Sequence, residues 1–459
     1  MSGTLILLAL ASGAACIARS SRVSVVAGVM TCSFGLAIFG SSLRCGGPSA
    51  LGMLSKEVPE CALRGAVLEH AGGLGTLVSA DRLACDGYAP LANGGPLILE
   101  GTVGQPGGAV RARGLLLPLR EDPFDIARGR LGAQAALHAS DVSTNPPSSG
   151  AHYVAAKVRS GLTRSTDPLD AHTGALISGL TIGDTRAFDE RVLETFRRAG
   201  LSHLLAVSGS NVAVVLATAG LLLRRLALVT RLLLAASALS FFVLVVGPEP
   251  SVLRAAVMGG IGLAALAWGE RAEPLQALGV ALTILLLVRP GMLFSVGLHL
   301  SAAATAGIVL WADPLARRLR GLPRPLALAL GATLGAQFAV APIVVGVFGE
   351  ASLIAPLANV LAFPAVAPAT VLGLAAGTVG AASVPLGMAV ARVAAPFAWW
   401  ILEVGSALGE PGWASIEVGH EWGWVLALPV LAIAVRTLMR NGGDDPATGF
   451  AGGSTKPAG

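Results

Sequence analysis

The sequence predicts a polytopic α-helical membrane protein with about eleven transmembrane helices and a small β domain inserted near its start, outside the membrane. Hydrophobic residues make up 54% of the 459-residue chain and charged residues 13%, a composition that excludes an ordinary soluble protein. Apolar runs long enough to cross a bilayer follow one another from residue 204 onward. Between residues 44 and 170 the apolar runs are short and glycines separate them, which is typical of strands joined by turns.

The predicted transmembrane segments fall into an N-terminal pair and a later group. They lie at 5–18, 23–43, 204–223, 227–247, 252–268, 275–289, 293–311, 326–348, 355–378, 385–405 and 422–438. Arg19 and Arg22 separate the first two and predict a cytoplasmic turn. We expect a retained hairpin over residues 1–43. The alternative is a signal-like leader, which the lack of a convincing cleavage site disfavours.

Charged residues between the segments predict the topology. Arginines that include Arg224, Arg317 and Arg436 fall on one side, whereas Glu249 and Glu350 fall on the other. Because arginine-rich loops stay in the cytoplasm, the N-terminus and the β domain are predicted outside and the C-terminal tail inside. That tail, residues 441–459, is rich in Gly, Asp, Pro and Thr and is predicted to be disordered.

The region over residues 44–170 is predicted to be a small β barrel or sandwich. Short β-type runs occur at 62–68, 75–79, 97–103 and 109–118. Glycine pairs between them mark turns, and 143–150, which contains Pro146 and Pro147, is predicted to be a loop.

Two kinds of side chain in this region are candidates for a role. Arg111 and Arg113 alternate onto one strand face, where they could meet DNA phosphates or simply face solvent. Cys61 and Cys85 are the preferred disulfide pair if the region faces an oxidising compartment. Cys45 also lies there, so the sequence leaves the pairing open.

Residues 173–215 join the β domain to the later membrane segments and organise the chain. Asp184 predicts the N-cap of a helix over 185–199. One apolar face of that helix is formed by residues at helical spacing, Phe188, Val192, Phe196 and Ala199. We expect the helix to lie along the bilayer surface; an ordinary surface helix of a soluble domain is the alternative.

The segment over 204–223 carries polar residues at its start. His203 and Ser208 are five residues apart, which is roughly 140° around a helix, so their side chains diverge and nucleophilic catalysis is disfavoured. Ser208 and Asn211 are three apart and share a face. Polar groups at membrane depth point into the bundle or into a water-filled path. The pair therefore predicts a pore lining or hydrogen bonds between helices.

A longer pattern surrounds these residues. The run 199–209 reads Ala-Gly-Leu-Ser-His-Leu-Leu-Ala-Val-Ser-Gly, after Ser178-Gly179-Leu180 and Gly183-Asp184. This pattern resembles the competence region of the ComEC family, the inner-membrane channels that admit DNA during natural transformation. The resemblance covers roughly residues 20–440. The family more often has Leu-His where this chain has Ser210-Asn211, and usually has Gln at the position of His299.

The resemblance implies a function and its partners. It implies that the external domain is OB-like, that residues 171–440 form a channel in the bacterial inner (plasma) membrane, and that single-stranded DNA passes into the cytoplasm. It also implies an external DNA receptor and a cytoplasmic helicase-like ATPase. Many relatives carry a C-terminal metallo-β-lactamase-like domain. This chain ends in a short polar tail, so we expect a separate nuclease. A homo-oligomer is left open.

Candidates for lining or gating the DNA path are the polar residues of the motif and the later spans. They are Asp184, His203, Ser208, Asn211, Arg254, His299, Gln337, Asn359 and Arg392. A polar group inside a span is costly in hydrocarbon and is expected to face protein or water, with hydrogen bonding between helices as the alternative role. Arg392 falls within a span and is expected in the interior, whereas Arg254 lies near a span end and could snorkel.

Missing motifs narrow the chemistry. The sequence has no Gly-x-x-x-x-Gly-Lys-[Ser/Thr] loop and no His-x-His or His-Glu-x-x-His pattern. We therefore expect no catalytic residue, no metal and no cofactor, and a motor on another chain. A transporter of another solute or polymer is the alternative function. A membrane-anchored binding module is disfavoured, because one span would be enough to anchor it and the sequence predicts about eleven.

Overall fold

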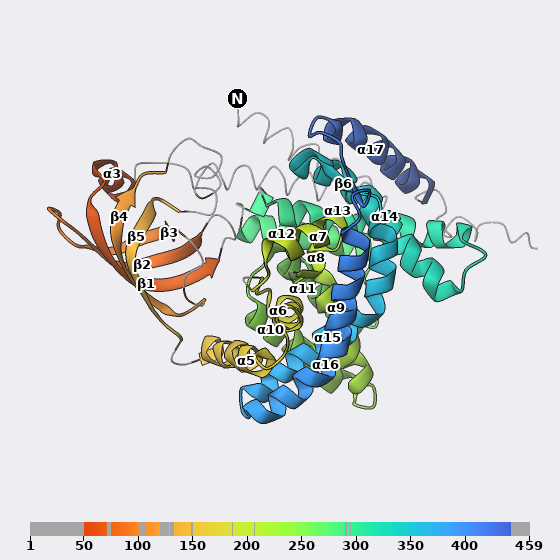
Figure 1. Cartoon of the computed structure of the whole chain (residues 1–459), viewed down its shortest axis with the longest axis horizontal. Coiled ribbons are helices and arrows are strands. Elements are labelled where there is room, and N and C mark those ends of the chain that lie inside the picture. The colour runs from red at the N-terminus through yellow and green to blue at the C-terminus, as the bar shows by residue number, and fades with distance from the viewer. Residues whose placement is uncertain are drawn as a thin grey trace, which may run out of the picture.

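A computed structural model of the chain describes residues 50–441, apart from 71–74, 101–103, 105, 120–127, 129–132, 148–149, 186, 206, 290–291 and 294. The predicted hairpin over 1–43 lies outside the described residues, as does the predicted tail beyond residue 441. Along the described chain a β barrel comes first and a helical region follows (Figure 1).

Five strands close into a barrel that stands to one side of the helices (Figure 1). They are β1 (Glu60–His70), β2 (Thr76–Cys85), β3 (Leu91–Leu99), β4 (Ala109–Leu117) and β5 (Ala136–Asn145). Neighbours run in the order β1-β2-β3-β5-β4, and β4 pairs with β1 to close the ring. β3 and β5 pair in parallel, whereas the other pairs are antiparallel. This is the strand order of an OB-like barrel.

Side-chain alternation along β4 shows how the barrel separates its core from its surface. Val110, Ala112 and Leu116 point inward and are at most 5% exposed, whereas Arg111 and Arg113 point outward. Alternation of this kind is what a closed barrel requires of every strand. The core of the barrel is therefore apolar and its charges are on the outside.

The last strand, β5, is absent from the sequence prediction. Its first two residues are buried and the rest are half-buried or exposed, so no apolar alternation marks it. The predicted loop over 143–150 is wrong in its first part, because β5 pairs with β4 as far as Asn145 opposite Ala109.

A disulfide joins β1 to β2. Cys61 and Cys85 are register partners with Cα atoms 4.0 Å apart, and their sulfurs are bonded. Both side chains are buried. The bridge spans a sequence separation of 24, for which chain-entropy arguments give roughly 3 kcal/mol of stabilisation.

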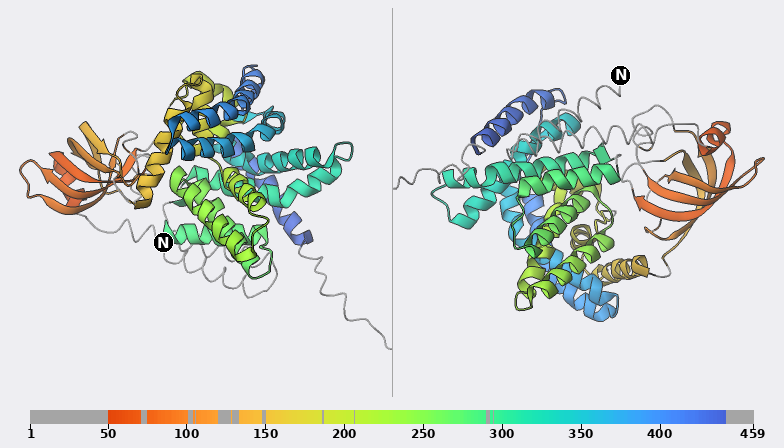
Figure 2. Two further views of the ribbon diagram at one scale, coloured as in Figure 1. Left: turned by 90° about the horizontal axis from the view of Figure 1, so that it is seen from below. Right: turned by 180° about the vertical axis from the view of Figure 1, so that it is seen from behind.

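The helical region begins directly after the barrel. Its helices are α5 (Gly150–Thr166), α6 (Ala171–Ile182), α7 (Glu190–Arg198), α8 (Ser202–Leu205), α9 (Gly209–Leu222), α10 (Leu228–Val246), α11 (Pro250–Ala267), α12 (Pro274–Val288), α13 (Val296–Arg318), α14 (Arg324–Phe348), α15 (Ala355–Gly380), α16 (Val384–Gly409) and α17 (Trp422–Asn441). Short strands β6 (Glu350–Ser352) and β7 (Ser415–Glu417) pair with each other, and α3 (Ala50–Leu54) with the turn η1 (Ser55–Glu57) precedes the barrel. Figure 2 shows α13 and α14 running side by side.

Within the described residues, six helices are long and apolar enough to cross a membrane, namely α10, α11, α13, α14, α15 and α16. α9, α12 and residues 425–438 of α17 are apolar but shorter. The chain is thus a multi-pass membrane protein. The first two of the predicted segments lie outside the described residues, so a total of eleven stays a prediction.

α5 packs against α15, α16, α10 and α6, although the sequence prediction placed its residues in the β domain. A Cβ built on Gly161 would lie 2.6 Å from the Gly377 carbonyl oxygen of α15. Ala155, Val158 and Leu162 form its buried face. α5 follows the barrel directly in the chain, and its close contact with α15 at Gly161 attaches that end of the barrel to the helical region.

Glycines four residues apart bring further helices together. A Cβ built on Gly331 of α14 would lie 2.3 Å from the Ala312 carbonyl oxygen of α13, and one on Gly335 would lie 2.8 Å from that of Gly307. In α15 a Cβ on Gly373 would meet the Thr181 side chain of α6. These helices approach too closely for any residue larger than glycine at these positions.

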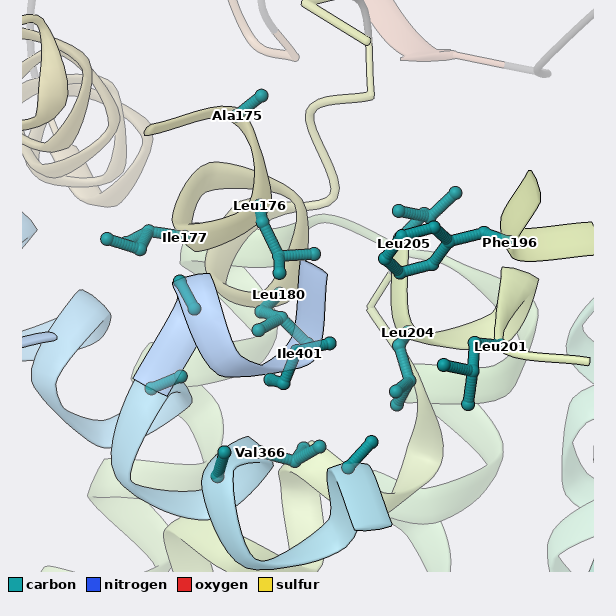
Figure 3. Close-up of a cluster of buried hydrophobic side chains, with 14 of the residues drawn as sticks. Ala175, Leu176, Ile177, Leu180, Phe196, Leu201, Leu204, Leu205, Val366 and Ile401 are labelled. Carbon is teal, nitrogen blue, oxygen red and sulfur yellow. The ribbon is translucent and has the colours of Figure 1, made fainter. Parts of the chain in front are cut away.

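A buried apolar cluster surrounds α6 and holds the segment that follows it. Leu176 and Leu180 of α6 lie next to Ile401 of α16 (Figure 3). Phe196 of α7 and Leu205 of α8 belong to the same cluster and are at most 4% exposed. The stretch from α6 to α8 is therefore seated in the core of the helical region.

Candidate functional site

The turn between α6 and α7 departs from the prediction. Gly183 ends α6 in the left-handed conformation, with φ +76°, and Asp184 follows in a half-buried turn. α7 begins only at Glu190, where the Asp189 carboxylate accepts the Val192 N–H at 2.8 Å. The prediction that Asp184 caps a helix over 185–199 is wrong, because Asp189 has the cap geometry and the helix is shorter.

The apolar face of α7 is buried in protein. Phe188, Phe196 and Ala199 are 8%, 1% and 0% exposed. A Cβ on Gly405 of α16 would lie 2.5 Å from the Phe196 ring. The core of the helical region therefore covers this face, and the expectation that the helix lies along the bilayer surface stays a prediction.

The predicted single helix over 204–223 is broken. α8 ends at Leu205 and α9 begins at Gly209, with Ser208 in an extended conformation between them. The Ser251 hydroxyl of α11 donates to the Val207 carbonyl oxygen at 3.2 Å. Valine, serine and glycine in succession favour a helix poorly, and a hydroxyl from a neighbouring helix satisfies a carbonyl that the break releases.

Asn211 ties the start of α9 to the end of α6. Its side chain is 1% exposed, and its amide Nδ2 donates to the Leu180 carbonyl oxygen at 2.8 Å. The hydroxyls of Ser208 and Ser210 lie 3.5 Å and 3.4 Å from Asn211 Oδ1. Ser208 and Asn211 thus come together, in a polar cluster at the helix break.

Arg254 of α11 completes this cluster. Its side chain is 5% exposed, so it does not snorkel to the membrane surface. Nε donates to Ser301 Oγ at 3.0 Å and Nη1 to Thr305 Oγ1 at 2.7 Å, both on α13. A Cβ on Gly209 would lie 2.4 Å from Nη2, so the guanidinium rests against the first residue of α9. Its recorded partners are neutral.

α9 is shorter than a full membrane span. Its 14 residues give a length of about 21 Å, against a hydrocarbon thickness of about 30 Å. We call the group of Ser208, Asn211 and Arg254 with the α8–α9 break the break site.

A second polar cluster holds the turn after α7. Gln337 Nε2 of α14 donates to the Ser352 carbonyl oxygen at 2.9 Å, and Ser352 Oγ donates to the Arg198 carbonyl oxygen at 2.6 Å. Asn359 Nδ2 bonds the Ala355 carbonyl oxygen at 2.8 Å and that of Gly200 at 3.5 Å. Gln337 and Asn359 therefore lie together, and their amides connect the turn after α7 to α14 and α15.

The other candidates lie outside the break site. His203 on α8 and His299 on α13 are exposed, and the His203 ring has a hydrogen bond to the Gly200 backbone, beside the second cluster. His203 and Ser208 are on opposite sides of the break. Arg392 of α16 is exposed, so the prediction that it lies in the interior is wrong. α16 is apolar all round, and its sequence does not mark the side that faces protein.

Arg111 and Arg113 lie on the outer face of the barrel, as the alternation predicts. Arg113 Nε is 2.9 Å from Glu60 Oε1 of β1. Within the residues that the structure describes, no group of three or more His, Cys, Asp or Glu side chains could hold a metal ion.

The sequence reading missed the partners of these residues. Ser251 bonds the helix break at Val207, and Ser301 and Thr305 accept hydrogen bonds from Arg254. Ser352 bonds the end of α7 at the Arg198 carbonyl oxygen. Small hydroxyl residues are common in apolar helices, so their type carries little signal. The four-residue spacing of Ser301 and Thr305, which places both on one face of α13, was the available hint.

Comparison with known proteins places this geometry in a family. The family described as "Competence protein" matches residues 180–442, more than half of the chain and all of the break site. The chain belongs to the competence protein family. ComE operon protein 3 of Bacillus subtilis is 33% identical over 206 residues, which cover 44% of this chain and 26% of that protein.

A second relative is the uncharacterized protein YcaI of Escherichia coli. It is 28% identical over 233 residues, which cover 46% of this chain and 30% of that protein. The chain thus matches less than a third of the length of either curated relative. No solved structure gave a significant match.

Proposed function

We propose that this competence-family protein passes single-stranded DNA across the bacterial inner membrane, and that the break site engages the phosphates of the strand. The observation that carries the proposal is Arg254, a buried cation with neutral partners that rests against the first residue of the short apolar helix α9. The start of a helix attracts anions, and a buried arginine adds a full positive charge.

The chemistry suits passage more than tight binding. A polyanion crosses a membrane protein when its donors are few and individually weak, so that it enters and leaves easily. Ser208, Ser210 and Arg254 supply donors of this kind on α9 and α11. Broken helices whose starts face an anionic substrate are a known device of membrane transport.

The proposal includes a topology and partners. We place the barrel outside the cell membrane and the C-terminal tail in the cytoplasm. The Cys61–Cys85 disulfide supports this, because disulfides persist in oxidising compartments. We assign DNA capture to an external receptor, the driving force to a cytoplasmic helicase-like ATPase, and strand degradation to a separate nuclease.

The test is uptake of labelled DNA into a DNase-protected pool in the host strain. We expect deletion of the gene to abolish the protected pool while DNA on the cell surface remains, and we expect the wild-type gene to restore it. Unchanged uptake in the deletion strain would reject the DNA substrate. A transporter of another solute or polymer would then be the better account.

A further inference from the structure

Arg159 of α5 bonds the end of α10. Its Nε donates to the Val245 carbonyl oxygen at 2.7 Å, and its Nη2 donates to the Leu244 carbonyl oxygen at 3.0 Å. The last carbonyls of a helix have no partner within that helix, and a cation beside them is favoured by the helix dipole. Arg159 therefore caps α10 from a neighbouring helix.

α5 is a firm support for this cap. It lies beside α15 and α16 (Figure 1). Two residues beyond Arg159, a Cβ built on Gly161 would lie 2.6 Å from the Gly377 carbonyl oxygen of α15. Val158 of α5 and Val245 of α10 belong to one buried apolar cluster. The Arg159 guanidinium thus extends from a helix that is itself tightly packed.

A short and stiff connection joins the end of α10 to α11. α10 ends at Val246 and α11 begins at Pro250. Gly247 is buried, with φ +106°, and Pro248 and Pro250 have their φ angles fixed by their rings. The start of α11 therefore has little freedom to move independently of the end of α10.

The first turns of α11 contribute to the break site. The Ser251 hydroxyl bonds the Val207 carbonyl oxygen at 3.2 Å, and the Arg254 guanidinium rests against Gly209. At 3.2 Å the bond from Ser251 is long for a hydroxyl donor, so a small displacement of α11 would break it. The geometry of the break site thus depends on where α11 begins.

We propose that Arg159 is a positioning residue for the break site. It fixes the end of α10, and through the connection over 247–249 it holds Ser251 and Arg254 against the break between α8 and α9. Arg159 acts through the backbone of α10 and α11 and needs no contact with the transported strand. The consequence for DNA passage rests on the proposed function.

Packing alone does not account for an arginine here. Arg159 Nη1 is buried, and no hydrogen-bond partner is recorded for it among the described residues. A buried donor without an acceptor costs stability, and an apolar side chain would avoid that cost. Apolar contacts are also non-directional, whereas bonds to two successive carbonyls fix both the position and the rotation of the end of α10.

The test is hydrogen–deuterium exchange of the full chain in nanodiscs. Arg159→Met preserves an extended side chain and removes both bonds, whereas Arg159→Lys keeps a charged donor. Arg164→Met is the matched control, because Arg164 is an exposed arginine of the same helix whose recorded bond is to the Ser160 carbonyl oxygen of α5. Ser251→Ala removes the bond at the break directly.

We expect Arg159→Met to raise the exchange rate over residues 204–216 roughly threefold or more and to leave residues 385–405 of α16 unchanged. Arg164→Met should match wild type, and Arg159→Lys should lie between. Unchanged exchange over 204–216 would overturn the proposal, as would an equal rise in α16, which a general loss of packing would cause. Should Arg159→Met fail to accumulate, Arg159→Lys decides the matter by the same two peptides.

The double variant adds a second criterion. Ser251→Ala should raise exchange over 204–216 about as much as Arg159→Met, and the two substitutions together should raise it little further, because both remove the same restraint. Fully additive effects would show that Arg159 does not act through Ser251 and would overturn the proposal.

The uptake assay separates this inference from the proposed function. Unchanged exchange over 204–216 in Arg159→Met, with uptake abolished by gene deletion, would reject the role of Arg159 alone. Faster exchange there, with uptake unaffected by gene deletion, would keep Arg159 as the positioning residue of the break site and reject the DNA substrate.

Discussion

The barrel and the helical region place their polar and apolar residues in opposite ways. The barrel has an apolar core that includes the Cys61–Cys85 disulfide, and its arginines face outward. The helical region exposes leucine, valine and tryptophan side chains over much of its surface and buries Asn211 and Arg254. The first arrangement suits a domain surrounded by water, and the second suits a domain surrounded by lipid.

This difference teaches where to look for function in each part. A buried charge in an apolar helical region is expensive, so Arg254 must have either an essential structural bond or a ligand. An exposed charge on a barrel costs little, so the exposure of Arg111 and Arg113 carries little information by itself. The same residue type therefore has a different meaning in the two parts.

The largest expected effect is at Arg254. Replacing it by methionine keeps much of its length but removes the hydrogen bonds to Ser301 and Thr305. Hydrogen bonds from a charged group contribute about 1.5–3 kcal/mol each, so we expect DNA uptake to fall at least tenfold. Immunoblots of the membrane fraction separate loss of protein from loss of passage. Full uptake in Arg254→Met cells would remove the break site from the account.

The disulfide of the barrel comes next. We expect Cys61→Ser to lower the free energy of unfolding of the barrel by about 3 kcal/mol, because the loop between the two cysteines regains its freedom in the unfolded chain. Limited proteolysis of the barrel against denaturant measures this. Cys85→Ser and the double variant should match the single one, and a clearly additive double variant would contradict the pairing.

A smaller effect is expected at the turn after α7. Gly200 has φ +70°, and a Cβ there would lie 2.3 Å from Ala355 Cβ. We expect Gly200→Ala to destabilise the helical region by about 1–3 kcal/mol. Gly220→Ala is the control, since nothing lies within 4 Å of its Cβ position. Thermal unfolding in detergent compares the two variants. Equal melting temperatures would show that the turn after α7 is not tightly packed against Ala355.

The smallest effect is expected at Arg392. Unlike Arg254, this charged residue of the helical region faces outward. It is exposed, and no bond to its side chain is recorded among the residues described. We expect Arg392→Met to change the free energy of unfolding by less than about 0.5 kcal/mol and to leave uptake unchanged. A loss as large as that of Arg254→Met would erase the distinction between buried and exposed arginines.

Sequence patterns predicted some of these features and missed others for identifiable reasons. The apolar segment at 227–247 is α10 within a residue at each end, because a membrane span is marked by its length and apolar content. The break at Ser208 was hidden, since apolar residues continue on both sides of it. The alignment of Arg64 with Arg82 and Arg111 across neighbouring strands was also missed, because cross-strand neighbours are known only once the strand register is known.

One measurement tests the central claim most directly. A photo-crosslinking amino acid is placed at position 210, the exposed serine at the start of α9, in cells that are taking up labelled DNA. The same amino acid at position 393, an exposed valine on α16, is the control. Our account predicts a DNA adduct from position 210 during uptake and none from position 393. Uptake that proceeds with no adduct at position 210, or with equal adducts at both, would contradict the claim that the strand passes the break site.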